Sequence, residues 1–67
     1  MIVRESVSST RISSVGWAND TLEIEFKDGA VYQYHGVSQQ EYKDFMNAPS
    51  LGSELSRLDK RHPYNRV

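Results

Sequence analysis

The residues best suited to binding chemistry lie in residues 56–67 of this 67-residue chain. This segment carries four cations against the single carboxylate of Asp59, whereas residues 1–55 carry four cations against eight carboxylates. Arginines beside an aromatic ring can hold phosphates and stack a base. Cations also suit the C-terminal end of a helix, so helix capping is the simpler explanation of the same cluster. The candidate nucleic-acid contacts of this basic C-terminal corner are Arg57, Lys60, Arg61, Tyr64 and Arg66. His62 belongs to the same segment and is expected to face solvent, and Arg4 or Arg11 could join the corner from the first strand.

A second candidate is the pair Tyr32 and Tyr34, which are separated by one residue. On a strand, side chains at this spacing lie on one face. Two exposed tyrosines would form a platform on which unpaired bases stack. The alternative is that both rings belong to the core and only their hydroxyls reach a polar partner. The register of the strand decides between these two interpretations.

The composition gives little indication of a catalytic site or a metal site. The chain has no cysteine and two histidines, which excludes a disulfide framework and the familiar zinc fingers. No serine lies in a Gly-x-Ser-x-Gly elbow, and the four glycines form no phosphate-binding loop. We therefore expect no catalytic residue, no metal site, no cofactor and no enzymatic activity.

Length and hydropathy bound the class of protein. Sixty-seven residues allow one small domain, spanning 1–67. No segment approaches the roughly 20 apolar residues that a membrane helix needs. The N-terminus lacks the apolar core of a signal peptide, so we expect a cytoplasmic protein without membrane contact. The pI of about 6.0 is lower than is typical of a dedicated nucleic-acid-binding domain.

Three strands are predicted at 12–18, 21–27 and 30–36. In the middle strand, Leu22, Ile24 and Phe26 alternate with charged residues, as expected for a sheet that is wet on one face. Turn-forming pairs, Asn-Asp at 19–20 and Asp-Gly at 28–29, flank this strand. The pattern predicts a three-stranded antiparallel β-meander.

The second turn can be built in two ways. A two-residue Asp-Gly loop would place Tyr32 and Tyr34 on the acidic outer face, beside Glu23 and Glu25. A three-residue loop, with Gly29 as the left-handed bulge residue, would place both tyrosines on the apolar face. The second option collects the large apolar side chains on one surface, and we prefer it because a one-residue slip exposes a whole strand.

Two helices are predicted after the strands. Ser38 and Glu41 form a capping box for the first helix, which Pro49 ends. Ser50 can cap the second helix, which Pro63 stops, leaving residues 64–67 as an extended end. The fold class is therefore α+β, with both helices packed on one sheet face. The predicted core comprises Val15, Trp17, Leu22, Ile24, Phe26, Tyr32, Tyr34, Tyr42, Phe45, Met46, Leu55 and Leu58.

These motifs together resemble the KTSC domain, a short module named after the C-terminus of some lysyl-tRNA synthetases and also found as a stand-alone bacterial protein. The resemblance rests on Val-x-Ser-x-x-Ile-x-x-Val-Gly-Trp at 7–17, Leu-x-Ile-x-Phe-x-x-Gly at 22–29 and Val-Tyr-Gln-Tyr-x-Gly-Val at 31–37. The central Tyr-x-Tyr is the signature of that family. The synthetase context implies RNA binding, although the resemblance assigns no activity.

We expect a non-enzymatic module that binds RNA weakly through the basic C-terminal corner. The alternative is a protein-interaction adaptor that uses a free strand edge, or an outer sheet face on which Ile12 and Val31 are exposed. The sequence leaves the oligomeric state open.

Overall fold

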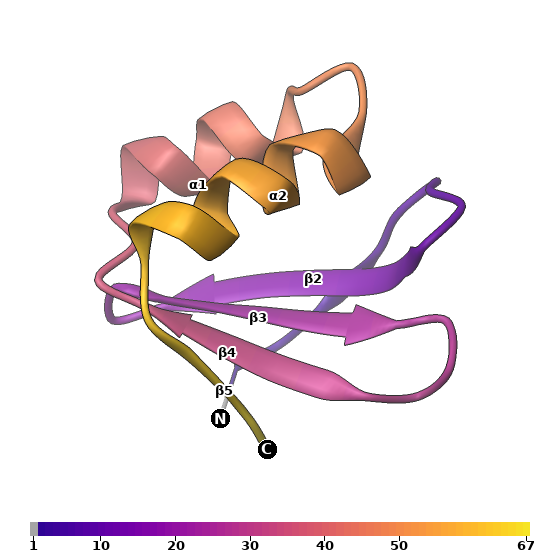
Figure 1. Cartoon of the computed structure of the whole chain (residues 1–67), viewed down its shortest axis with the longest axis horizontal. Coiled ribbons are helices and arrows are strands. Elements are labelled where there is room, and N and C mark those ends of the chain that lie inside the picture. Colours follow the sequence, from indigo (N-terminus) through magenta and orange to yellow (C-terminus); the bar gives the residue numbers. More distant parts are fainter. Residues whose placement is uncertain (1) are drawn as a thin grey trace.

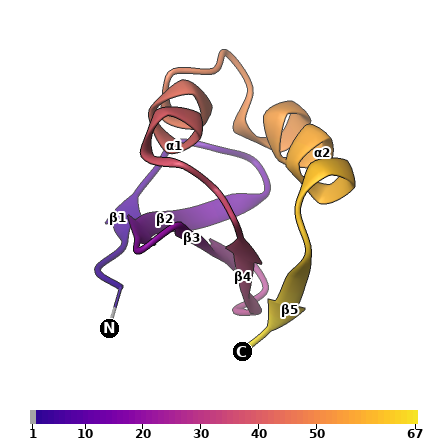
Figure 2. The ribbon, with the colours of Figure 1, turned by 90° about the vertical axis from the view of Figure 1, so that its left-hand side faces the viewer.

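The computed structural model describes residues 2–67 as one antiparallel sheet covered on one face by two helices (Figures 1 and 2). The strands lie side by side in chain order, β1-β2-β3-β4-β5. The helices follow β4 and precede β5. Their bounds are β1 Glu5–Ser6, β2 Ile12–Ala18, β3 Thr21–Phe26, β4 Val31–His35, α1 Gln39–Met46, α2 Leu51–Arg61 and β5 Tyr64–Arg66. Within residues 2–67, no helix has the length and apolarity needed to cross a membrane.

The α+β class and the two covering helices are as predicted, but the three-stranded sheet is wrong because the sheet has five strands. The two additional strands form its edges. β1 pairs with β2, with Glu5 opposite Val15, and β5 pairs with β4, with Tyr64 opposite Tyr34. The extended end that follows Pro63 is therefore part of the sheet. These strands are only two and three residues long, and all their residues are exposed. They therefore lack the alternation of apolar and polar residues by which a strand is predicted from sequence.

Both hairpin registers agree with the sequence prediction. Asn19 and Asp20 have φ of 50° and 60°, as in a two-residue type I′ turn. In the second turn the Phe26 N–H donates to the carbonyl of Ala30 at 2.8 Å, and Gly29 has φ of 92°. Only glycine adopts that conformation without strain. Ile24 consequently lies opposite Tyr32, and Leu22 opposite Tyr34.

Ile12 lies on the covered face rather than on the outer face where the alternation of β2 would place it. The register of β2 against β3 shifts between Ile12 and Ser14, so Ile12 lies opposite Phe26 and is fully buried. Such a bulge reverses the side-chain direction of the residues before it. Val31 is half-buried. An adaptor surface built on an exposed Ile12 is therefore excluded.

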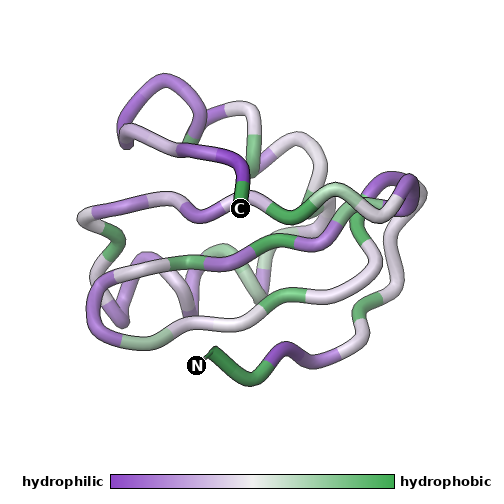
Figure 3. Tube along the Cα trace, turned by 90° about the horizontal axis from the view of Figure 1, so that it is seen from below, coloured by the Kyte–Doolittle hydropathy of each residue, from purple (hydrophilic) through white to green (hydrophobic). Residues whose placement is uncertain are grey.

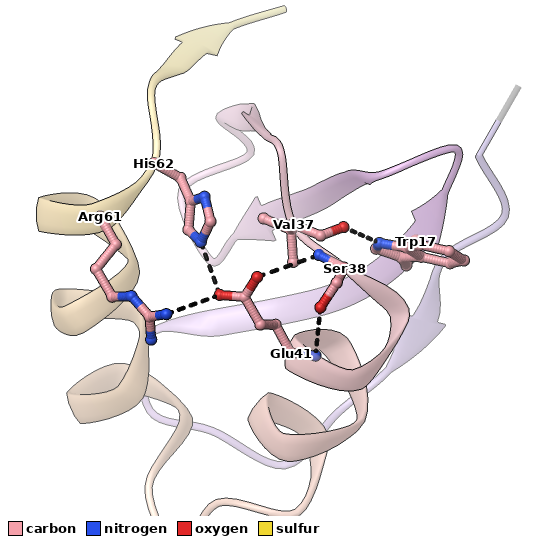
Figure 4. Close-up of polar contacts among 6 residues, drawn as sticks. All are labelled: Trp17, Val37, Ser38, Glu41, Arg61 and His62. Carbon is pink, nitrogen blue, oxygen red and sulfur yellow. Dashed lines mark hydrogen bonds and ion pairs between the residues drawn. The ribbon is translucent and has the colours of Figure 1, made fainter.

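The helices begin as the sequence predicts. The Ser38 hydroxyl accepts from the backbone N–H of Glu41 at 3.1 Å, and the Glu41 carboxylate accepts from the Ser38 N–H at 3.2 Å (Figure 4). The Ser50 hydroxyl accepts from the Ser53 N–H at the start of α2. Since these bonds satisfy otherwise orphaned N–H groups, they fix where each helix starts.

The core lies between the sheet and the helices, and Figure 3 shows hydrophobic and hydrophilic residues alternating along the strands. Seven of the predicted core residues are buried, and two buried residues were not predicted, Ile12 and Val37. The predicted members Trp17, Phe26, Tyr32, Tyr42 and Met46 are only partly buried and border the core. The buried core comprises Ile12, Val15, Leu22, Ile24, Tyr34, Val37, Phe45, Leu55 and Leu58.

On the outer face of the sheet, polar side chains form hydrogen bonds and an ion pair with one another. Arg4 forms an ion pair with Glu23, which also accepts from the Gln33 amide at 2.9 Å. The Ser14 hydroxyl donates to Glu25 at 2.9 Å. Glu23 and Ser14 are each only 8% exposed. The carboxylates of β3 are thus held by partners instead of standing free in solvent.

Candidate binding site at the C-terminal corner

The predicted corner residues come from two consecutive elements. Arg57, Lys60 and Arg61 lie on α2, and Tyr64 and Arg66 lie on β5, which returns along β4 (Figure 2). All five are exposed. The five residues thus lie on two elements that follow each other along the chain, and their use as a nucleic-acid contact stays a prediction.

Two of these cations have acidic partners on the helices. Arg57 lies 3.8 Å from Glu54 on the same helix, and Arg61 lies 3.4 Å from Glu41 of α1. No ion pair of Lys60 or Arg66 occurs within the described part of the chain, residues 2–67. Exposed pairs contribute little to stability, but they reduce the positive potential available to a phosphate. The corner is therefore less basic than its sequence suggests.

His62 joins the two helices, so the prediction that it faces solvent is wrong. Its Nε2 lies 2.8 Å from the Glu41 carboxylate, and its side chain is only 12% exposed (Figure 4). This hydrogen bond, with contributions from the Ser38 N–H and the Arg61 charge, lowers the pKa of Glu41 below its ordinary value. His62 and Arg61 thus link the end of α2 to the start of α1, which is a structural role.

Tyr34 is a core residue, and its hydroxyl has one polar partner. The side chain is 3% exposed, and its hydroxyl donates to Oδ1 of Asp59 on α2 at 2.6 Å. Burial, and then the Asp59 carboxylate, raise the pKa of Tyr34 far above its ordinary value. The phenol therefore stays neutral and remains a donor at neutral pH. The burial of Tyr34 therefore excludes a stacking platform made of two exposed tyrosines.

Tyr32 is less buried and forms part of an aromatic pocket at the edge of the core. Its ring meets Phe26 at a centroid distance of 5.7 Å and an interplanar angle of 84°, and Tyr64 at 6.0 Å and 64°. Tyr64 also rests on Tyr34, with ring centroids 5.0 Å apart. The cavity has a volume of about 200 Å³ and is lined by Phe26, Tyr32, Tyr34, Tyr64 and Asp59.

The registers explain why these rings meet. Residues directly opposite each other in an antiparallel pair share a face. Tyr64 lies opposite Tyr34 and Arg66 lies opposite Tyr32, so both β5 side chains are on the helix-covered face. At 50% exposure, Tyr64 closes the outer side of the aromatic pocket while leaving one of its own sides to solvent.

Asp59 is the pocket residue that sequence reasoning missed, because it was counted only as one acid among basic residues. A helical signal was available. Asp59 follows Leu55 by four residues, and residues at this spacing share a helix face. Since Leu55 is buried, Asp59 must lie at the border of the buried face, next to the sheet.

A larger hollow of about 590 Å³ lies elsewhere, between residues 7–11 and residues 46–56. Arg11 is its only charged lining residue, beside backbone, hydroxyl and apolar groups. Arg4 and Arg11, which were considered as additions to the basic corner, thus lie in other parts of the molecule. Within residues 2–67, no group of three or more His, Asp or Glu side chains could hold a metal ion.

Comparison with known proteins agrees with this fold. A crystal structure of a KTSC domain protein from Yersinia pestis superimposes with a TM-score of 0.90 at 34% sequence identity, covering 100% of this chain and 99% of that one. A protein of Stutzerimonas stutzeri (strain A1501), described as an uncharacterized protein, is 30% identical over 63 residues, covering 91% of this chain and 89% of its own. The family model of the KTSC domain matches residues 8–64, and the chain therefore belongs to the KTSC domain family.

Proposed function

We propose that this chain is a non-enzymatic interaction module, a single domain acting in the bacterial cytoplasm, that binds an extended segment of a partner protein. The binding surface is the free edge of β5 together with the aromatic pocket beside it. The observation that carries the proposal is the position of this pocket directly against an edge strand. A pocket in this position can select particular side chains of a strand that pairs with the edge.

The backbone of β5 supports strand addition. The Pro63 carbonyl accepts from the His35 N–H, and the Val67 N–H donates to the Val31 carbonyl, both at 2.9 Å. Backbone groups alternate in direction along an antiparallel strand. The N–H and C=O of Tyr64 and Arg66 therefore point away from β4. Of these, only the Arg66 carbonyl has a partner within residues 2–67, a long 3.5 Å bond from the Asn65 amide.

The pocket supplies what the backbone cannot. Backbone hydrogen bonds give affinity without distinguishing one peptide from another, whereas pockets beside the edge select side chains. Tyr64 contributes to both parts, since its backbone lies on the edge and its ring lines the pocket. A strand that pairs with β5 would place its alternate side chains on the same face as this ring.

RNA binding is the second candidate, and the synthetase context of the family resemblance first suggested it. It is favoured by the half-exposed Tyr64 ring and by Lys60 and Arg66, which have no acidic partner within residues 2–67. It is disfavoured by the carboxylates of the same corner, since Asp59 lines the pocket and Glu54 and Glu41 already pair with arginines. We therefore rank it below peptide binding.

Two variants of one residue distinguish these candidates. Arg66→Pro removes the charge and the outward N–H, and proline is tolerated in an edge strand where its N–H is not needed. Arg66→Ala removes the charge alone. We expect capped hexapeptides of alternating Val and Thr, each with one variable position, to shift the NMR signals of the Tyr64 and Arg66 amides and to slow their hydrogen exchange. Arg66→Pro should abolish this binding, and Arg66→Ala should retain it.

The same titration with single-stranded RNA decades at 20 and 150 mM salt tests the second candidate. If RNA binding weakens steeply with salt and is lost equally in both Arg66 variants, RNA binding would be favoured over peptide binding as the function. Combined replacement of Arg57, Lys60 and Arg61 by Ala should abolish it as well. If neither the peptides nor the RNA perturbs the β5 amides, the proposed function is wrong.

A further inference from the structure

The aromatic pocket combines aromatic rings with a negative charge, whereas the larger hollow beside Arg11 has no aromatic lining residue. Four of the five residues that line the aromatic pocket are aromatic, and the fifth, Asp59, carries its only charge. From this combination we infer that the pocket binds an alkylammonium group, supplied by a lysine side chain, free or N-methylated, of the bound peptide. This inference rests on the proposed function and names the side chain that the added strand presents.

Electrostatics favour a cation in the pocket. The face of an aromatic ring is negative, so it attracts an ammonium group that lies within about 6 Å of the ring centre. The Tyr34 hydroxyl occupies only Oδ1 of Asp59, which leaves Oδ2 for a second donor. Asp59 is itself exposed at the pocket, so a cation that enters from solvent can reach it.

The angles between the rings distinguish an ammonium group from a nucleobase. A flat base is held best in a slot between parallel faces. Here Phe26 and Tyr32 stand at 84° and Tyr32 and Tyr64 at 64°, so these three rings form a corner. Tyr34 and Tyr64 are more nearly parallel, at 33°, but their centroids are only 5.0 Å apart, so no slot for a base lies between them. A compact tetrahedral group can contact two faces of such a corner at once, whereas a flat ring can stack on only one of them.

The size of the pocket is also that of a single head group. Its volume of about 200 Å³ is smaller than the roughly 300–1,000 Å³ of sites that enclose whole small-molecule ligands. A long unbranched stem could cross from the β5 edge and place only its terminal ammonium among the rings. Lysine has such a stem, with its charge concentrated at the end.

Arg66 is the cation against which this inference can be tested. It lies on the same face of β5 as Tyr64, opposite Tyr32, but it does not line the pocket. Its positive charge at the margin of the pocket repels an incoming ammonium group. Arg66→Ala should therefore strengthen ammonium binding, whereas the same change would weaken the binding of any anion.

The probes are choline chloride and 3,3-dimethyl-1-butanol, its neutral isostere with carbon in place of the ammonium nitrogen. Each is titrated into the full chain while the ring signals of Tyr32 and Tyr64 are followed by NMR. We expect choline to bind at least about fivefold more tightly than the isostere. Asp59→Asn should weaken choline binding about two- to fivefold. Glu54→Gln, which removes a carboxylate of α2 outside the pocket lining, should leave it unchanged.

The peptide experiment then separates this inference from the proposed function. In the Val-Thr hexapeptides, lysine or trimethyllysine at the variable position should bind more tightly than norleucine, which keeps the stem without the charge. Peptides that bind equally well with lysine and norleucine would refute the ammonium site while leaving strand addition intact. Equal affinity for choline and its isostere, or equal effects of Asp59→Asn and Glu54→Gln, would refute it too. If choline binds selectively but no peptide engages β5, the proposed function fails and the ammonium site stands.

Discussion

Tyr34→Phe tests how much the contact between β4 and α2 contributes to stability. The substitution keeps the ring, which is 3% exposed, and removes only the hydroxyl that donates to Asp59 at 2.6 Å. Hydrogen bonds to a charged group contribute about 1.5–3 kcal/mol. Because Asp59 is exposed and regains water when the hydroxyl is lost, we expect a loss at or just below the lower limit of this range, about 1–1.5 kcal/mol. For a domain of this size, that corresponds to a fall in Tm of roughly 5–10 °C.

The free energy of unfolding can be measured by urea denaturation, followed by the fluorescence of Trp17, the single tryptophan of the chain. A double-mutant cycle with Asp59→Asn isolates the interaction from other effects of each substitution. Tyr64→Phe is the matched control, since it removes a phenol hydroxyl from the same pocket without touching this bond, and it should stay within about 0.5 kcal/mol of the wild type. A coupling energy indistinguishable from zero would show that the bond does not hold α2 on the sheet.

The same bond predicts the alkaline behaviour. The pKa of Tyr34 is raised in the folded state, because burial and the Asp59 carboxylate oppose ionisation, whereas the unfolded phenol keeps its ordinary value of 10.0. The stabilisation is therefore complete below about pH 10 and declines as the pH rises above it. Tyr34→Phe should remove much of this decline. An alkaline unfolding limb that is unchanged in Tyr34→Phe would contradict the argument.

Three further predictions concern the close packing of β2, the helix junction and the aromatic pocket. Gly16→Ala should cost about 1–3 kcal/mol in urea unfolding, because its Cβ would lie 2.4 Å from the Val3 carbonyl oxygen; Gly52→Ala, which would meet only the flexible Arg11 side chain, should be neutral or stabilising. Glu41→Gln should flatten the acid limb of stability, because the lowered pKa of Glu41 makes its contribution complete near neutral pH and lost as the pH falls below about 4.5; an unchanged acid limb would contradict this. Tyr32→Ala should destabilise by about 2 kcal/mol, less than for a fully buried ring, and a cost near zero would mean that the ring does not pack.

The hairpins and helices were predictable because each is specified by local chemistry. The alternation of Leu22, Ile24 and Phe26 fixes the buried face of β3, and Gly29 supplies the left-handed residue that the three-residue turn requires. Ser38 and Glu41 mark the helix start by side-chain hydrogen bonds within one turn. None of these signals depends on a distant segment, so a sequence pattern was sufficient to read them.

The errors occur where the determining contact is distant in sequence. Ile12 was placed on the outer face because period-two alternation cannot reveal the bulge that reverses it. The strand β5 was not predicted because backbone hydrogen bonds to His35 and Val31 hold it, and a hydropathy pattern does not show such bonds. The prediction that His62 faces solvent is wrong because its partner, Glu41, is 21 positions away in the sequence.

The aromatic pocket depends on three such determinants acting together. The Gly29 turn places Phe26 and Tyr32 on the covered face, the helical period places Asp59 beside the sheet, and β5 pairing brings Tyr64 onto Tyr34. The first two belong to elements that contribute buried residues to the core, whereas β5 contributes none. Loss of β5 pairing would consequently remove the Tyr64 wall while leaving the bond between Tyr34 and Asp59 in place. Ligand binding and global stability should therefore respond separately to changes in β5, and together to changes at Tyr34.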